Sequence, residues 1–201
     1  MWSPSCGGRR RLFVFGAVNG AMDVSMNAHG VAVERELPKP IMSSLHGGWS
    51  VGGFLAAGTV AIAAAAGLDP RVESLIVGIV VWTLVEYLIH RFAYHCAPIL
   101  TPLHDIHHRN PRAYVGVPSF LSSGFIVAVC YRPLRPFEPI VASGFTSGVL
   151  VGYAAYMFVH HATHHFKIEP GDWLYDARVR HMAHHYHPDA NFGVTTGLWD
   201  M

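Results

Sequence analysis

Residues 72–95, VESLIVGIVVWTLVEYLIHRFAYH, join a long apolar run to a pair of histidines, and this combination decides the fold. The run Val72–Ile89 is strongly apolar, and its only two charged side chains are glutamates. A bilayer core of about 30 Å needs about 20 helical residues, so the run predicts a membrane-spanning helix. Because His90 and His95 follow directly, we expect metal-binding chemistry to begin where the span ends.

Three further apolar stretches accompany this run: Gly47–Gly67, Tyr114–Cys130 and Pro139–Val159. The first and the last have about the length of a membrane span, whereas the one that contains Gly116 and Pro118 is marginal. The sequence therefore predicts an all-α membrane protein with about four transmembrane helices in two hairpins. The alternative is that these stretches form the buried core of a soluble helical protein.

Positive charge divides unevenly across the predicted hairpins. If residues 1–46 are cytosolic, the loop 90–113 and the tail from residue 160 share their side, which then holds 11 Lys and Arg against three on the far side. Cytosolic loops of membrane proteins carry such an excess of Lys and Arg. The loop and the tail also contain most of the chain's histidines, so we expect an integral membrane protein with its histidine-rich part on the cytosolic side.

Composition favours a lipid-facing protein. Charged residues make up 13% of the 201-residue chain and the AVILMFWYC set 51%, whereas a soluble domain has roughly 25% charged residues. A net charge of +1 without a dominant basic run argues against nucleic acid as a partner. The three cysteines have no CxxC spacing and predict neither a disulfide framework nor a thiolate metal site.

Histidine is the unusual component, because 13 of the 15 histidines lie between His90 and His187. They form four motifs: HRFAYH at 90–95, HDIHH at 104–108, HHATHH at 160–165 and HMAHHYH at 181–187. Positions i, i+3 and i+4 share a helix face, so HDIHH and HMAHH are each expected to present three imidazoles to one point. His90 and His95 are five residues apart and can meet only where the helix bends or frays.

Ten histidines are thus placed to be metal ligands: His90, His95, His104, His107, His108, His160, His164, His181, His184 and His185. One ion rarely takes more than about six ligands, so ten imidazoles suit two ions, although imidazole binds iron, zinc and copper alike. Three others lie off these faces and are interpreted as outer or solvent-facing residues: His161, His165 and His187. A metal-storage tract is the alternative, but such tracts are usually disordered and of low complexity.

These motifs and the end of the sequence resemble one known family. The segments WTLVEYLIHRFAYH, HDIHHRNP, GYAAYMFVHHATHH and HMAHHYHPDANFGVTTGLWD are similar, in this order, to the fatty acid hydroxylase / sterol desaturase superfamily of membrane di-metal oxygenases. The resemblance covers about residues 72–200 and implies a four-span helical fold with a cytosolic, histidine-rich, di-metal helical cap. It implies two metal ions, iron in the family and zinc possible in purified protein, with O₂ as co-substrate and a lipid substrate. It also implies a separate electron donor of the cytochrome b5 or ferredoxin type.

The family's ligand positions fall on the same ten histidines. Three carboxylates are candidate acceptors for imidazole N–H groups, which would fix the ring orientations: Asp105, Asp176 and Asp189. No catalytic residue is assigned beyond the metal centre. The predicted function is O₂-dependent hydroxylation of a C–H bond in a fatty acyl chain, sphingolipid, sterol or carotenoid. The alternatives are a non-catalytic metal-binding membrane protein and an inactive fusion remnant.

The N-terminal part resembles a different family. The segment FGAVNGAMDVSMNAHGVAVERELPKPIMSSLHGGWSVGGF is similar to a stretch of bacterial major facilitator transporters, and the likeness extends over about residues 13–67. A transporter needs two helical halves around a midplane site, whereas this fragment supplies one or two spans. We therefore expect an irregular, transporter-like segment 1–46, followed by a hydroxylase domain 47–201 whose motifs lie in 72–201.

Overall fold

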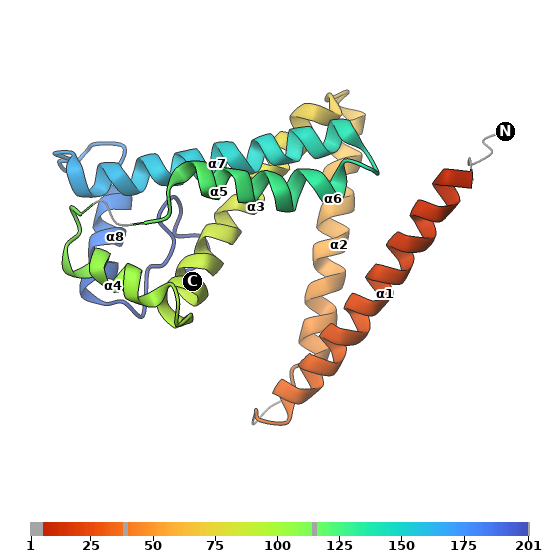
Figure 1. The fold of residues 1–201 in the computed structure, drawn as a ribbon, viewed down its shortest axis with the longest axis horizontal. Coiled ribbons are helices and arrows are strands. Elements are labelled where there is room, and N and C mark those ends of the chain that lie inside the picture. Colours follow the sequence, from red (N-terminus) through yellow and green to blue (C-terminus); the bar gives the residue numbers. More distant parts are fainter. Residues whose placement is uncertain (1–5, 38–39, 114–115, 201) are drawn as a thin grey trace. The chain divides into compact units, whose positions relative to one another are not determined.

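The computed structural model describes residues 6–37, 40–113 and 116–200, and every regular element in these ranges is a helix (Figure 1). The chain divides into two compact units, Met1–Leu68 and Asp69–Met201. The prediction of an all-helical fold is therefore confirmed for the described ranges.

The first unit contains α1 (Cys6–Glu34) and α2 (Met42–Ala65). The carboxylate of Glu34 accepts hydrogen bonds from the backbone N–H groups of Ile41 and Met42, each at 2.7 Å. It thereby satisfies donors at the start of α2 that have no partner within the helix. After α2 ends, Gly67 takes φ +67°, the left-handed conformation typical of a glycine that follows a helix.

The prediction of an irregular segment 1–46 is wrong for most of the residues described there. α1 is a helix of 29 residues, and its sequence contains no proline, while isolated glycines weaken a helix without ending it. α2 covers the first predicted span, but several of its side chains lie outside the described residues, and its assignment as a span stays a prediction. The predicted domain boundary after residue 46 also stays a prediction, whereas the compact units divide at Leu68.

The second unit is built from consecutive helical segments: α3 (Pro70–Leu88), the π-helix η1 (Ile89–Tyr94), α4 (Thr101–Arg109), α5 (Ser119–Ile126), the π-helix η2 (Val127–Tyr131), α6 (Arg132–Leu134), α7 (Pro139–His165) and α8 (Tyr175–Tyr186). The two longest α-helices of this unit begin at a proline preceded by an acidic cap. Asp69 accepts a hydrogen bond from the N–H of Arg71 at 2.8 Å, and Glu138 accepts one from the N–H of Ile140 at 3.3 Å. Such caps satisfy the free amides of a first helical turn.

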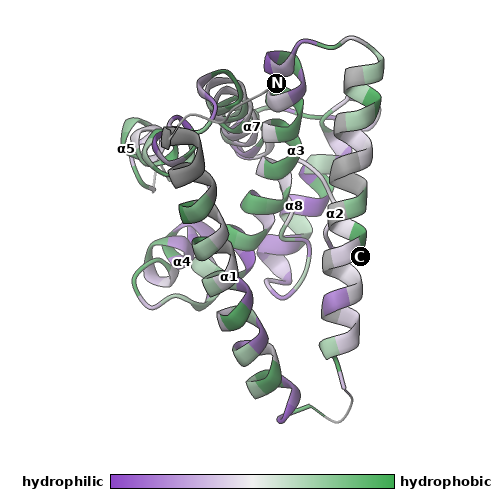
Figure 2. Cartoon of the chain, turned by 90° about the vertical axis from the view of Figure 1, so that its right-hand side faces the viewer, coloured by the Kyte–Doolittle hydropathy of each residue, from purple (hydrophilic) through white to green (hydrophobic). Residues whose placement is uncertain are grey.

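Two helices of the described chain are long and apolar enough to cross a membrane, Pro70–Tyr94 with 25 residues and Pro139–His165 with 27. They coincide with the second and fourth predicted apolar stretches. Only 28% and 33% of the residues in their most apolar 18-residue stretches are buried inside the structure. This favours contact with lipid over the core of a soluble protein. Figure 2 shows hydrophobic residues along α3 and hydrophilic residues concentrated on α8.

The third predicted stretch, Tyr114–Cys130, differs from the helix found there. The helical segment runs over Ser119–Leu134 and is shorter than a full span. It begins directly after Pro118, whose ring fixes the backbone at the start of a helix. Residues 114 and 115 lie outside the described ranges.

Glycines allow α3 and α7 to approach closely. A Cβ atom on Gly148 would overlap the carbonyl oxygen of Leu75, and one on Gly78 would overlap that of Phe145. A Cβ on Gly152 would lie 2.6 Å from the Cβ of Trp82. Small residues spaced by four are typical of helices that pack closely in membranes. The two long apolar helices therefore form the rigid frame of this unit.

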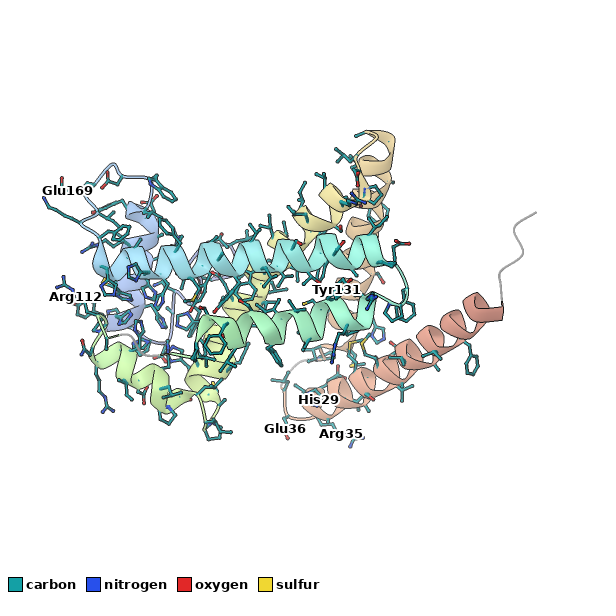
Figure 3. All side chains as sticks on the ribbon, turned by 45° about the horizontal axis from the view of Figure 1, so that its top comes forward. His29, Arg35, Glu36, Arg112, Tyr131 and Glu169 are labelled. Carbon is teal, nitrogen blue, oxygen red and sulfur yellow. The ribbon has the colours of Figure 1, made fainter. Side chains whose placement is uncertain are left out.

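The histidine motifs gather at one end of this frame. α4 and α8 lie near the C-terminal end of α7 (Figure 1), and Figure 3 places Arg112 and Glu169 at that end and Tyr131 at the other. A buried cluster joins α7, α8 and the segment after α8, with Ala162, Ala177 and Val194 among its members. This cluster fixes the position of α8 and of the closing segment beside the histidines of α7.

Candidate metal centre

A π-helical segment brings the first histidine pair together. η1 continues α3, and its i→i+5 hydrogen bonds place residues five apart near one face. The ring centroids of His90 and His95 accordingly lie 5.3 Å apart, with 31° between the ring planes. The predicted distortion of the helix at this spacing is confirmed, and the π-helix provides it without fraying.

Two groups of histidines converge at this end of the unit. In each group, one ring nitrogen of every member lies within 4.8 Å of those of all other members. The first group consists of His90, His95, His104, His108 and His184, and the second of His107, His160, His164 and His181. His185 borders the second group, because its Nε2 lies 3.2 Å from Nε2 of His181.

The prediction that each HxxHH motif presents three imidazoles to one point is wrong. On α4, His104 and His108 belong to the first group and His107 to the second. α8 repeats the division with the groups exchanged, because its i+3 histidine, His184, belongs to the first group. Residues four apart are about 40° apart around a helix, whereas adjacent residues are about 100° apart. Each motif therefore points its i, i+4 pair toward one group and its i+3 member toward the other.

The nitrogen positions fit metal ions. Two nitrogens that lie about 2.1 Å from one ion, at right angles, are about 3 Å apart. The distance between Nε2 atoms is 3.1 Å for His90 and His104 in the first group and 3.0 Å for His107 and His160 in the second. The two groups therefore have the spacing of ligand sets around two ions.

The protonation state of these rings also suits metal binding, which requires neutral imidazole. Burial, followed by the charges of neighbouring imidazoles, lowers the pKa values of His107, His108 and His185 to about 4 each. The same causes take the pKa of His181 well below its usual range. These rings are neutral at pH 7, so a metal ion would not have to displace their protons.

A backbone strip after α8, residues 190–195, orients two members of the first group. Nδ1 of His90 lies 2.6 Å from the carbonyl oxygen of Phe192, and Nδ1 of His184 lies 2.7 Å from that of Ala190. A carbonyl oxygen only accepts, so each Nδ1 carries the hydrogen and each Nε2 keeps its lone pair for a metal ion. Sequence reasoning missed these acceptors, because a backbone carbonyl has no signature in the residue types.

A cavity of about 150 Å³ opens beside both groups. His104 of the first group and His107 and His160 of the second lie in its wall. Tyr94 stacks on His104 with centroids 5.1 Å apart, and Tyr156 stacks on His160 with centroids 5.7 Å apart. The rest of the wall is largely apolar and includes Leu103, Val117 and Met157. The cavity can therefore hold an apolar group against both histidine groups.

Residues 75–201 match the family of known proteins described as fatty acid hydroxylase. The match covers more than half of the chain and includes both histidine groups. The chain belongs to the fatty acid hydroxylase family.

Individual relatives agree with this family. The chain is 34% identical to the fatty acid 2-hydroxylase of Rattus norvegicus over 141 residues, 62% of this chain and 37% of that protein. It is 31% identical to the ceramide very long chain fatty acid hydroxylase scs7 of Schizosaccharomyces pombe over 140 residues, 62% of this chain and 40% of that protein. The solved structure of full-length scs7p, in which only the hydroxylase domain is visible, superposes with a TM-score of 0.57 at 26% identity. That likeness covers 76% of this chain and 63% of the other.

The three aspartates predicted to contact imidazoles have different surroundings in this member of the fatty acid hydroxylase family. Burial lowers the pKa of His95, while the charges of Asp105 and Asp189 nearby act in the opposite direction. Asp176 lies in the first turn of α8. The Nδ1 atoms of His90 and His184 bond to backbone carbonyls and not to these carboxylates. Their assignment stays a prediction.

The remaining histidines of the motifs lie outside both groups. His161 and His165 lie on a different face of α7 from His160 and His164, and their rings stack with centroids 4.3 Å apart. His187 is exposed at the end of α8. These positions agree with the interpretation of all three as outer residues.

Proposed function

We propose that this protein is a membrane-bound di-iron hydroxylase that converts a C–H bond of a lipid acyl chain into C–OH. The observation that carries this proposal is the pair of converging histidine groups in the wall of a shared, largely apolar cavity. The reaction consumes the acyl chain, O₂, two electrons and two protons, and it yields the hydroxylated chain and one water. The names of the relatives refer to fatty acids and ceramide, which favours an acyl chain over a sterol or carotenoid and favours carbon 2.

Ten histidines would hold the two ions in this proposal. The five members of the first group would hold one ion, and the second group together with His185 would hold the other. When bound, iron supplies the activation of O₂ that an unactivated C–H bond requires. Zinc could occupy the same nitrogens in purified protein, because imidazole suits both metals.

The chain's own residues would place the acyl chain and exclude water from it. Leu103, Val117 and Met157 offer apolar contacts along the cavity wall. Tyr94 and Tyr156 lie in the same wall, beside His104 and His160, and their hydroxyl groups could donate hydrogen bonds to the acyl carbonyl next to carbon 2. This arrangement would bring carbon 2 to the boundary between the two histidine groups.

We further propose four membrane spans with the histidine-rich end in the cytosol. The two long apolar helices and the excess of Lys and Arg at that end support this orientation. The two electrons would come from a separate donor of the cytochrome b5 or ferredoxin type. Arg109 and Arg112 are exposed near the end of α4 and offer positive charge to an acidic donor surface.

The test is product analysis under ¹⁸O₂. The full-length chain is expressed in a host without lipid hydroxylases, and extracted acyl chains are analysed by mass spectrometry. The expected product is a 2-hydroxy acyl chain that carries one ¹⁸O atom. Iron-loaded protein that yields no hydroxylated lipid, or only desaturated chains, would contradict the proposal.

A larger side chain in the cavity should block the lipid without affecting the metal ions. Met157→Trp is expected to lower hydroxylation at least about tenfold, because the indole fills space that the acyl chain would occupy. Iron content, measured by mass spectrometry, should remain that of the wild type. Val151→Trp, on the same helix but outside the cavity wall, is the matched control and should retain activity. Equal activities of the two variants would argue against the cavity as the lipid site.

A further inference from the structure

The two histidine groups differ in what holds Nδ1 of their three most buried rings, those of His90, His181 and His184. In the first group, Nδ1 of both His90 and His184 donates to a backbone carbonyl, at 2.6 and 2.7 Å. In the second group, Nδ1 of His181 is buried, and the described residues offer it no hydrogen-bond partner. An outer acceptor fixes the tautomer and orientation of a ligand ring, and its loss typically costs about 10–100-fold in metal affinity. The first group is therefore better organised for metal binding than the second.

Glu86 holds the strip that supplies these carbonyls. One of its carboxylate oxygens, Oε1, accepts hydrogen bonds from the N–H groups of Val194 at 3.1 Å and Thr195 at 2.8 Å. Glu86 precedes His90 by four residues, so one face of the α3–η1 helix contacts the strip twice. It accepts from the strip through Glu86 and donates to it through the ring of His90.

The strip has a second carboxylate support. Asp200 accepts hydrogen bonds from the N–H of Phe192 at 2.7 Å and from that of Gly193 at 2.9 Å. A Cβ on Gly193 would overlap the carbonyl oxygen of Thr196, so the chain must fold back tightly there. Asp200 therefore holds the peptide group that contains the Phe192 carbonyl and the one before it, and Glu86 holds the two peptide groups that follow.

The burial of the Glu86 carboxylate is unfavourable for stability, which indicates that this residue has a functional role. Its side chain is only 3% exposed, its Oε2 has no hydrogen-bond partner among the described residues, and no described Lys or Arg forms an ion pair with it. A buried carboxylate without a cation is unfavourable for stability. Ionisable residues within membrane spans usually mark functional sites. Within the described residues, Oε1 of Glu86 accepts from the peptide N–H groups of Val194 and Thr195, so Glu86 acts directly on the strip.

We propose that Glu86 is a positioning residue for the first metal centre, and that the two centres are inequivalent as a result. The first centre retains its ion more tightly, and the second releases its ion first. This inference rests on the proposed binding of two ions and adds an order of release.

The test is the rate of metal release from full-length protein in lipid nanodiscs. The protein is loaded with Zn²⁺ and mixed with excess of a chromogenic chelator. The wild type is expected to release two ions per chain in two phases. His184→Ala should remove the slow phase and His164→Ala the fast phase, which assigns each phase to one group.

Glu86→Ala is expected to accelerate the slow phase at least about tenfold and to leave the fast phase unchanged. Glu86→Gln keeps an acceptor oxygen for the two N–H groups and should restore most of the wild-type rate. Glu73→Ala removes the other acidic side chain of α3 and is the matched control, with both phases unchanged. Asp200→Ala, which removes the second carboxylate support of the strip, should show the same selective acceleration even if Glu86→Ala does not fold.

Three results would overturn the inference. They are a single release phase in the wild type, equal acceleration of both phases by Glu86→Ala and Asp200→Ala, and no acceleration by either. Each of these results leaves two bound ions and the proposed function intact. A wild-type protein that binds no stoichiometric Zn²⁺ or iron would instead contradict the proposed function itself.

Discussion

Replacing His184 by Ala is expected to lower hydroxylation by more than about 100-fold and to leave one metal ion per chain where the wild type has two. Loss of a direct ligand should lower metal affinity and activity more than loss of an outer hydrogen-bond partner, which typically lowers them about 10–100-fold. The side chain of His184 is completely buried, and its Nε2 lies 3.1 Å from Nε2 of His95. Its removal would take one nitrogen from the first group and one anchor from the 190–195 strip. Metal analysis and product formation measure the two effects.

His187→Ala is the control for this substitution. It removes an exposed histidine three residues further along, outside both groups, and should leave metal content and activity unchanged. Full activity of His184→Ala would contradict the assignment of the first metal centre. Loss of both ions from His184→Ala would contradict the division of the ligands into two separate groups.

Gly148→Leu is expected to destabilise the second unit by about 3 kcal/mol or more, enough to prevent recovery of folded protein. The added side chain would meet the backbone of α3 at Leu75, and backbone cannot move aside as a flexible side chain can. Because η1, which continues α3, carries His90 and α7 carries His160 and His164, separation of these helices would also dismantle both metal groups. Fluorescence-detected size-exclusion chromatography after heating measures the loss.

Gly124→Leu is the matched control for this packing prediction. Gly124 lies on α5, and a Cβ at this position meets nothing within 4 Å. The control should therefore melt like the wild type. Similar melting of both variants would show that close contact of α3 and α7 does not hold the unit together.

Helical periodicity explains how much of the site was predictable. All nine histidines of the two groups were among the ten predicted ligands, because metal ligands on helices recur at i, i+3 and i+4. Their division between two groups was not predictable from one helix alone. His107 and His108 are adjacent in sequence, yet they serve different groups because α4 lies between the two.

The parts of the fold that were missed depend on backbone and on contacts between helices. The apolar runs around Val85 and Val149 identified two long helices by their hydropathy. Their close packing depends on glycines, whose role a hydropathy pattern does not reveal. The π-helix at His90 was expected only as a distortion. Glu86 was visible as a charge within an apolar run, but its partners, the amides of Val194 and Thr195, are more than 100 residues away in sequence.

Metal stoichiometry of purified, full-length protein tests the central claim most directly, namely that the converging histidines form two metal sites. The protein is purified in detergent without affinity tags that bind metal, and iron and zinc are quantified against protein concentration. Two ions per chain are predicted for the wild type, and one for a variant that lacks a ligand of either group, such as His95→Ala or His160→Ala. Wild-type protein without stoichiometric metal, after reconstitution with ferrous iron under anaerobic conditions, would contradict the account.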